Sequence, residues 1–287
     1  MSPFDNISDI GKLTSYEFES LCRYFSSYAL LGGREGLVRI LTRYKMFVDV
    51  SDRSLVPHLV MDGFWETPVT QSIVRIVKPG DVCVDIGAHL GYFSVLMSAL
   101  TGKEGKTIAV EPNASIASML RLTSCINHPG FEVWEGALTN VTKEVEIHIP
   151  ISKTGDSSLL VRADSAKEGF GHQTVLGTTL DKLLTSLSIE RVNVIKMDAE
   201  GAEPLIFEGM EHVLNKNGDL RIVMEFSPFL YRDPEGFGEY LLDRFDVFKI
   251  AAGFILEEAD SRQFAEWSEF KSHVDLLLGP KGEGPPY

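Results

Sequence analysis

The stretch that decides the fold is residues 79–94, which read PGDVCVDIGAHLGYFS. Residues 82–86 form a short apolar run, rich in β-branched side chains and interrupted only by Asp85, as in a strand buried on both faces. Gly87 and Gly91 follow, and then an apolar helical pattern begins. A buried strand that leads through a glycine turn into a helix predicts an open α/β sheet with a ligand at that turn.

The same alternation of strand and helix continues along the chain. Together these elements predict an α/β fold with a doubly wound, mostly parallel sheet that helices cover on both faces. We expect further strands at residues 107–110, 131–134, 192–197 and 220–226, helices at 91–100, 116–125, 204–214 and 237–252, and final apolar runs at 254–256 and 274–278.

Two regions depart from this rhythm. Residues 1–65 are expected to form an N-terminal extension, with an amphipathic helix over residues 16–30 and a short β-like stretch after it. Its aromatic stripe indicates core packing or a dimer face, and the extension is a candidate pocket cap. The main domain is then residues 66–287. Within it, residues 145–149 alternate in polarity and 152–171 are polar, which predicts an inserted hairpin with a lid.

Composition excludes several classes of protein. The 287 residues carry a formal net charge of −14, which argues against binding to nucleic acid or to an anionic membrane. Three scattered cysteines predict buried thiols in a reducing compartment. The start, MSPFDNISDI, lacks a secretory pattern, and no apolar run approaches the roughly 18 residues that span a bilayer. We therefore expect a soluble, cytoplasmic protein.

Acidic residues stand where three of the predicted strands end. Asp85 would repel a pyrophosphate but suits an ammonium group, and Glu111 is placed to accept both hydroxyls of a ribose. Glu135, with the small residues Gly136 and Ala137 after it, can flank an adenine. The glycine turn lacks the third glycine of a dinucleotide site and the lysine of a P-loop, which nearly excludes a nicotinamide-dependent dehydrogenase. This set of groups describes S-adenosylmethionine.

Four segments in order, PGDVCVDIGAHLGYFS, AVEPN, TTLDKLL and VIKMDAEGAEPLIFEGM, resemble the FkbM-type family of class I, Rossmann-like S-adenosylmethionine-dependent methyltransferases. The resemblance covers roughly residues 64–228, and the block KMDAEGAE at residues 196–203 is its most specific part. It implies O-methylation of a hydroxyl on a sugar or a natural product. It also implies that residues near the strand ends bind the cofactor; we assign this role to Asp85, Gly87, Ala88, His89, Gly91, Tyr92, Phe93, Ser94, Glu111, Pro112, Glu135, Gly136, Ala137 and Asp198.

Methyl transfer to a weakly acidic hydroxyl calls for a base or a metal. Asp198, Glu200 and His89 are the catalytic candidates. Glu200 is alternatively a charge at the N-terminus of the following helix. His89 stands where the family more usually has Asn, and it is alternatively a residue of the cofactor wall. Ser94 is expected to meet the methionine carboxylate. Asp198 and Glu225 end neighbouring strands and suggest ligands for Mg²⁺, although Glu225 could instead cap a turn.

Substrate contacts are the least constrained part of the prediction. Trp65 and Glu66 precede the main domain and can cap the cofactor or simply pack; residues 156–158 (Asp156, Ser157 and Ser158) are substrate contacts or a turn, and His172 is expected in a surface loop. The acceptor is then a small molecule or a glycan. N- or carboxyl-methylation, and a non-catalytic S-adenosylmethionine-binding protein, stay open as alternatives.

Overall fold

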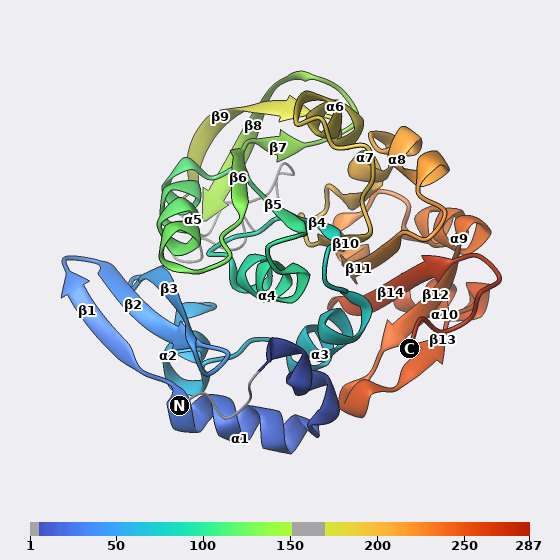
Figure 1. Cartoon of the computed structure of the whole chain (residues 1–287). Helices are drawn as coiled ribbons and strands as arrows, with labels where there is room; N and C mark the ends of the chain where they lie inside the picture. The colour runs from blue at the N-terminus through green and yellow to red at the C-terminus, as the bar shows by residue number, and fades with distance from the viewer. Residues whose placement is uncertain (1–5, 151–169) are drawn as a thin grey trace.

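The computed structural model describes residues 6–150 and 170–287. Its centre is an eight-stranded sheet in the order β13-β12-β14-β11-β10-β4-β5-β6 (Figure 1). The strands are β4 (Val82–Ile86), β5 (Lys106–Glu111), β6 (Glu132–Glu135), β10 (Val194–Met197), β11 (Arg221–Phe226), β12 (Phe245–Ile250), β13 (Leu256–Glu258) and β14 (Val274–Pro280).

Strands β6, β5, β4, β10 and β11 pair in parallel, whereas β14, β12 and β13 join them antiparallel. After β4 the chain runs to β5 and β6 on one side and then crosses to β10 and β11 on the other. Strand order therefore reverses between β4 and β10, which is where open α/β sheets bind their ligands.

Helices cover both faces of the sheet, as predicted. The apolar residues divide into two main cores because successive strand residues point to opposite faces: Cys83 belongs to one core and Val84 to the other. The first core contains α3 (Thr67–Ile76), α4 (Tyr92–Thr101) and α5 (Ala114–Ile126), and the second contains α6 (Leu180–Ser186), α7 (Glu203–Glu208), α8 (Glu211–Lys216), α9 (Pro234–Arg244) and α10 (Ser261–Trp267).

The N-terminal extension differs in detail from the prediction. The helix expected over residues 16–30 ends at Phe25, and Tyr28 already begins a strand. Of its aromatic stripe, Phe18 is fully buried, whereas Tyr16 and Tyr24 are 80% and 81% exposed, so only part of the stripe is core. The extension consists of η1 (Ile7–Lys12), α1 (Ser15–Phe25), an antiparallel sheet of β1 (Tyr28–Gly32), β2 (Glu35–Ile40) and β3 (Tyr44–Asp49), and α2 (Val56–Asp62).

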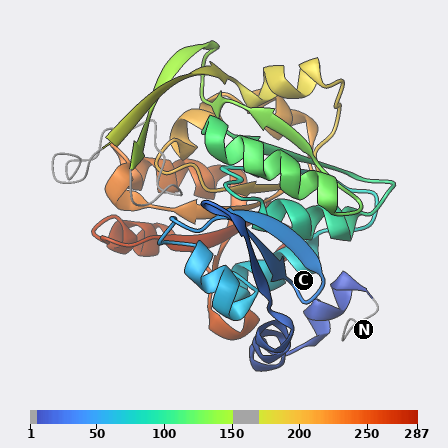
Figure 2. The ribbon, with the colours of Figure 1, turned by 90° about the vertical axis from the view of Figure 1, so that its left-hand side faces the viewer.

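The inserted hairpin is present, formed by β8 (Lys143–Pro150) and β9 (Phe170–Thr178), with β7 (Ala137–Leu138) pairing beside β9. In both views it lies on the opposite side of the molecule from α1 (Figure 2). His172, expected in a loop, is part of β9, because the strand continues closer to the tip of the hairpin than its polar sequence indicated. Residues 156–158 lie outside the described residues.

Two predicted helices are wrong in extent. The helix expected at 204–214 is broken into α7 and α8 at Gly209, where a Cβ would stand 2.3 Å from the carbonyl oxygen of Thr139. The helix expected at 237–252 ends at Arg244, and the following residues form β12, which pairs with β14 and β13. Across the described ranges, no helix combines the length and the apolar character needed to cross a membrane.

Candidate active site

A cavity of about 390 Å³ opens at the carboxyl ends of β4, β5, β10 and β11, beside the point of strand reversal. Its size is typical of a small-molecule site. The residues that line it come from the extension, the strand ends, the hairpin and the loops between them: Ser54, Leu55, Trp65, Glu66, Ile86, Gly87, Ala88, His89, Tyr92, Phe93, Val110, Glu111, Pro112, Gly136, Ala137, Leu138, Ile147, Lys196, Asp198, Ala199, Glu200, Ala202, Ile206, Glu225, Phe229 and His273.

The turn after β4 forms one wall. Gly87 has a φ of +73°, and a Cβ there would lie 1.7 Å from the carbonyl oxygen of Asp198, so only glycine fits. Gly91, with a φ of +94°, packs against Leu120, where a Cβ would lie 2.4 Å from the side chain. The sharp turn is as predicted. However, Gly87 makes this close approach to the end of β10 and not to a ligand. The contact brings together the ends of β4 and β10, which border the cavity.

Glu111 ends β5 and is held rigidly. Its carboxylate oxygens accept the backbone N–H groups of His89 at 2.9 Å and Asn113 at 2.8 Å. Burial raises the pKa of Glu111 to about 7, although these two hydrogen bonds act in the opposite direction. Each oxygen can accept one more hydrogen bond, and Glu111 lines the cavity, which fits the two hydroxyls of a ribose.

Asp85 and Ser94 lie behind this wall and do not line the cavity. The Ser94 hydroxyl donates a hydrogen bond to Asp85 Oδ2 at 2.5 Å and so holds this acid in place. Ser94 was expected to contact the methionine carboxylate instead. Asp85 is fully buried, which raises its pKa, and its Oδ1 has no hydrogen-bond partner within the described part of the chain. Such an orphaned carboxylate oxygen is costly, and because Asp85 lies behind the wall, the structure does not place it for the predicted contact with an ammonium group in the cavity.

Lys196 is the functional residue that sequence reasoning missed. It is 6% exposed, and its Nζ lies 3.1 Å from Asp198 Oδ2 and 5.0 Å from the ring centre of Phe93. Burial alone would lower the pKa of Lys196, but the neighbouring acids, Asp198 first, outweigh it and raise that pKa above its usual range. The sequence signal was a lone lysine within the otherwise apolar strand VIKM, since a buried lysine requires charged partners.

Three further polar side chains, those of Glu66, Glu225 and His273, line the cavity. Burial raises the pKa of Glu66 to about 8 and that of Glu225 to about 7, and in each case nearby carboxylates add to the effect. His273 Nδ1 lies 3.5 Å from Glu225 Oε2. Glu225 also caps the turn that follows β11, as the alternative prediction had it, because the Ser227 hydroxyl donates a hydrogen bond to Glu225 Oε1 at 2.6 Å.

The magnesium hypothesis gains no support from this arrangement. Asp198 and Glu225 both line the cavity, but Asp198 is paired with Lys196, and a cation already fills the position beside it. Among the described residues, the one group of three side chains that could hold a metal contains neither acid and lies on the hairpin.

Several predicted residues do not line the cavity. Glu135 is on the surface, where it forms an ion pair of 2.9 Å with Arg121, and Gly91 lies behind the turn. By contrast Trp65, Glu66, Ala88, His89, Tyr92, Phe93, Pro112, Gly136, Ala137 and Glu200 all line it, as expected. Trp65 is tied to α4, because its carbonyl accepts the Thr70 hydroxyl at 2.7 Å, and that hydroxyl lies 3.1 Å from the Tyr92 hydroxyl.

Comparison with known proteins agrees with this geometry. The family model described as "Methyltransferase FkbM domain" matches residues 85–256, more than half of the chain. The chain therefore belongs to this family. It is a class I methyltransferase that uses S-adenosylmethionine.

The chain is also similar to solved structures of low sequence identity. Precorrin-6y C5,15-methyltransferase from Geobacter metallireducens is 16% identical, with a TM-score of 0.40, over 74% of this chain and 85% of that one. An O-methyltransferase from Bacillus cereus in complex with SAH is 13% identical, with a TM-score of 0.42, over 74% and 79%. The tRNA (uracil-54, C5)-methyltransferase of Pyrococcus abyssi is 11% identical, with a TM-score of 0.43, over 86% and 44%. No curated protein matches the chain.

Proposed function

We propose that this methyltransferase methylates a hydroxyl oxygen on a sugar or a natural-product scaffold. The observation that carries the proposal is the set of carboxyl groups, Glu66, Asp198 and Glu225, that lines the cavity in addition to Glu111. Carboxylates accept hydrogen bonds from several hydroxyl groups at once, so this wall suits a polyhydroxylated acceptor.

The same wall weighs against other acceptors. Glu66, with a pKa of about 8, is largely protonated near neutral pH, so an acceptor carboxylate would be repelled by the two other acids, Asp198 and Glu225, which disfavours carboxyl-methylation. An amine is the second candidate, because the acids would also attract an ammonium group. A protein that only binds the cofactor is disfavoured, since buried acids with strongly raised pKa values gather at catalytic sites.

Bound S-adenosylmethionine would supply an electrophilic methyl group on its sulfonium. In our assignment Glu111 orients the cofactor through its ribose, and Asp85, behind the cavity wall, holds the start of α4 through its hydrogen bond with Ser94. Asp198, whose Oδ2 is held by Lys196, accepts a hydrogen bond from the acceptor hydroxyl and takes its proton as the oxygen attacks.

The other two catalytic candidates receive different roles. His89 is assigned to the cofactor wall, because its backbone N–H is bonded to Glu111. Glu200, in the loop after β10, stays a second candidate base. Glu225, with a pKa of about 7, is well matched to proton transfer near neutral pH and is assigned to the acceptor together with Glu66.

The test is a methyl-transfer assay with labelled S-adenosylmethionine on three acceptor panels: glycosides and polyketide alcohols, amines, and carboxylic acids. Methylation of the hydroxyl panel, with mass spectrometry placing the new group on oxygen, is the expected result. Methylation confined to amines would replace the proposal with the second candidate, and methylation confined to acids would refute the electrostatic argument.

Within that assay, Asp198→Asn should lower kcat by about 10²–10⁴-fold, the usual contribution of a general base. Affinity for S-adenosylmethionine, measured by calorimetry, should change little because Glu111 and the β4 turn are intact. Asp219→Asn is the matched control, since Asp219 also pairs with a basic residue, Arg191, but on the surface. Unchanged turnover in Asp198→Asn would remove Asp198 as the base.

A further inference from the structure

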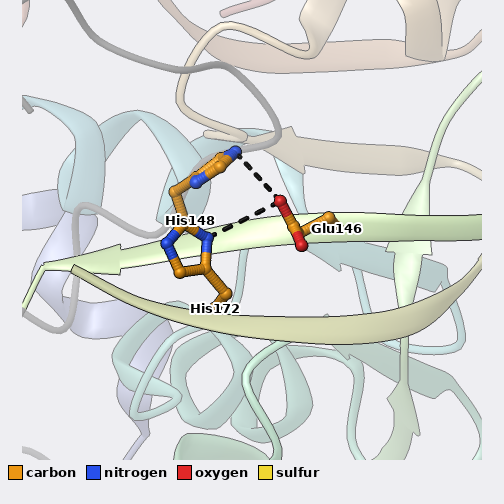
Figure 3. Close-up of side chains that lie close together, drawn as sticks. All are labelled: Glu146, His148 and His172. Atoms are coloured by element: carbon orange, nitrogen blue, oxygen red, sulfur yellow. Dashed lines mark ion pairs between the residues drawn. The ribbon is translucent and has the colours of Figure 1, made fainter.

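The hairpin of β8 and β9 carries a group of two histidines and one glutamate outside the cavity. Successive residues of a strand point to opposite faces. Ile147 is buried and lines the cavity, so its neighbours Glu146 and His148 point away from it. His172 on β9 lies directly opposite His148 in the strand register. Figure 3 shows the three side chains gathered on this outer face.

The geometry points to a metal site, and we propose that Glu146, His148 and His172 bind a Zn²⁺ ion. Glu146 Oε1 lies 3.9 Å from His148 Nε2 and 3.6 Å from His172 Nδ1. One ligand atom from each of the three side chains lies within 4.8 Å of the other two. The two imidazole rings meet edge to face with their centres 4.9 Å apart.

The donor set selects the metal. Two imidazole nitrogens with one carboxylate oxygen suit zinc, whereas Mg²⁺ and Ca²⁺ prefer oxygen alone. Tetrahedral zinc with bonds of about 2.0–2.1 Å places its ligand atoms about 3.4 Å apart, so the observed separations require only modest side-chain rotation. Glu146 and His172 are 58% and 56% exposed, which leaves room for water as the fourth ligand.

The ion would have a structural role and not a catalytic one, since its ligands face away from the cavity. The imidazoles come from two different strands, so one ion would link β8 to β9. On the inner face of the same hairpin, Gln173 accepts the N–H of Ala114 at 3.3 Å and donates to the carbonyl of Pro112, a residue of the cavity wall. A zinc ion on the outer face would therefore stabilise one wall of the cofactor cavity.

Calorimetric titration of the untagged, metal-free full chain with Zn²⁺ tests the site. One ion per chain is expected, with affinity reduced at least about tenfold in His172→Gln. The control is His58→Gln, because His58 is 59% exposed and lies 3.8 Å from Asp62 but has no second imidazole. Absence of stoichiometric binding in the natural chain, or an equal loss in His58→Gln, would overturn the proposal.

A second readout is independent of affinity. Co²⁺ in a four-coordinate site gives a strong visible absorption that the hydrated ion lacks, and it should appear on addition to the natural chain. It should be missing in His148→Gln, whose circular dichroism without metal is expected to match the natural chain. A spectrum identical to that of hydrated Co²⁺ in the natural chain, or one retained in His148→Gln, would count against the site.

Discussion

At the scale of single residues, three residues that line the cavity have an unusual backbone conformation. Glu66, His89 and Glu200 have φ values of +40°, +48° and +52°, a left-handed conformation that non-glycine residues seldom adopt. All three line the cavity. Such a conformation persists only where the surrounding structure enforces it, and it is concentrated at functional sites.

Gly87 gives a residue-scale prediction. Gly87→Ala should destabilise the protein by more than about 4 kcal/mol, because the new Cβ would collide with the backbone of Asp198. The matched control is Gly80→Ala: Gly80 also has a left-handed φ, +87°, but a Cβ there would meet no atom within 4 Å, so it should lose only the conformational cost of about 1–2 kcal/mol. Urea denaturation of both variants measures the difference. Equal losses would show that the contact with β10 is unimportant.

At the scale of elements, β10 is unusual because it buries a charge inside the sheet. Lys196 compensates Asp198 and Asp85. Lys196→Met should therefore cost about 3–5 kcal/mol at pH 8, and less at pH 5, because burial raises the pKa of Asp85 and so favours its uptake of a proton as the pH falls. Denaturant unfolding at the two pH values measures this.

The control for that experiment is another lysine on a strand. Lys249 on β12 pairs with Glu257 at 3.3 Å, but both are largely exposed, so Lys249→Met should cost less than about 1 kcal/mol at either pH. A Lys196→Met variant as stable as this control, or one equally destabilised at both pH values, would contradict the role assigned to the buried pair.

At the scale of the whole molecule, the buried acids determine how stability depends on pH. Burial raises the pKa of Glu111 and of Glu203 to about 7, from 4.5. The folded chain therefore holds protons that the unfolded chain has already released, and the free energy of unfolding should fall as pH rises from about 4.5 to about 7. The loss is up to about 3 kcal/mol for each acid.

Chemical denaturation of the cofactor-free protein across this range tests the sign. Glu203→Gln should reduce the slope, since burial of the Glu203 carboxyl group causes part of the effect, whereas the backbone N–H groups of Ala199 and Gly201 that donate to it act in the opposite direction. Stability that rises over the same interval would mean that these acids are ionised in the folded state.

The N-terminal extension also belongs to the whole molecule. Phe18 and Ile10 share one apolar core with α3, α4 and one face of the central sheet. The predicted boundary after residue 65 stays a prediction, as do the dimer face on α1 and the cytoplasmic location. The exposed Tyr16 and Tyr24 are the residues that a dimer face on α1 would use.

The sequence predicted features that depend on local patterns, but it did not predict features that depend on contacts between distant parts of the chain. Strand β4 and the turn after it were predicted closely, because a buried strand and a glycine turn are local patterns. The end of α9 at Arg244 was not, since apolar spacing there suits a helix and only pairing with β14 makes it a strand. Gly209 and Lys196 likewise depend on partners distant in the chain, Thr139 for Gly209 and Asp85 and Phe93 for Lys196.

By itself the sequence determined the α/β class, the family, the cofactor and most of the strand-end acids, because local periodicity and short motifs encode them. Tertiary structure alone decided that Lys196 neutralises the acids, that Glu135 turns to the surface, and that Glu66 and Glu225 meet Asp198. It also brought His148 and His172 together from two strands. Those outcomes depend on burial and on distances between side chains far apart in the chain, which no local pattern specifies.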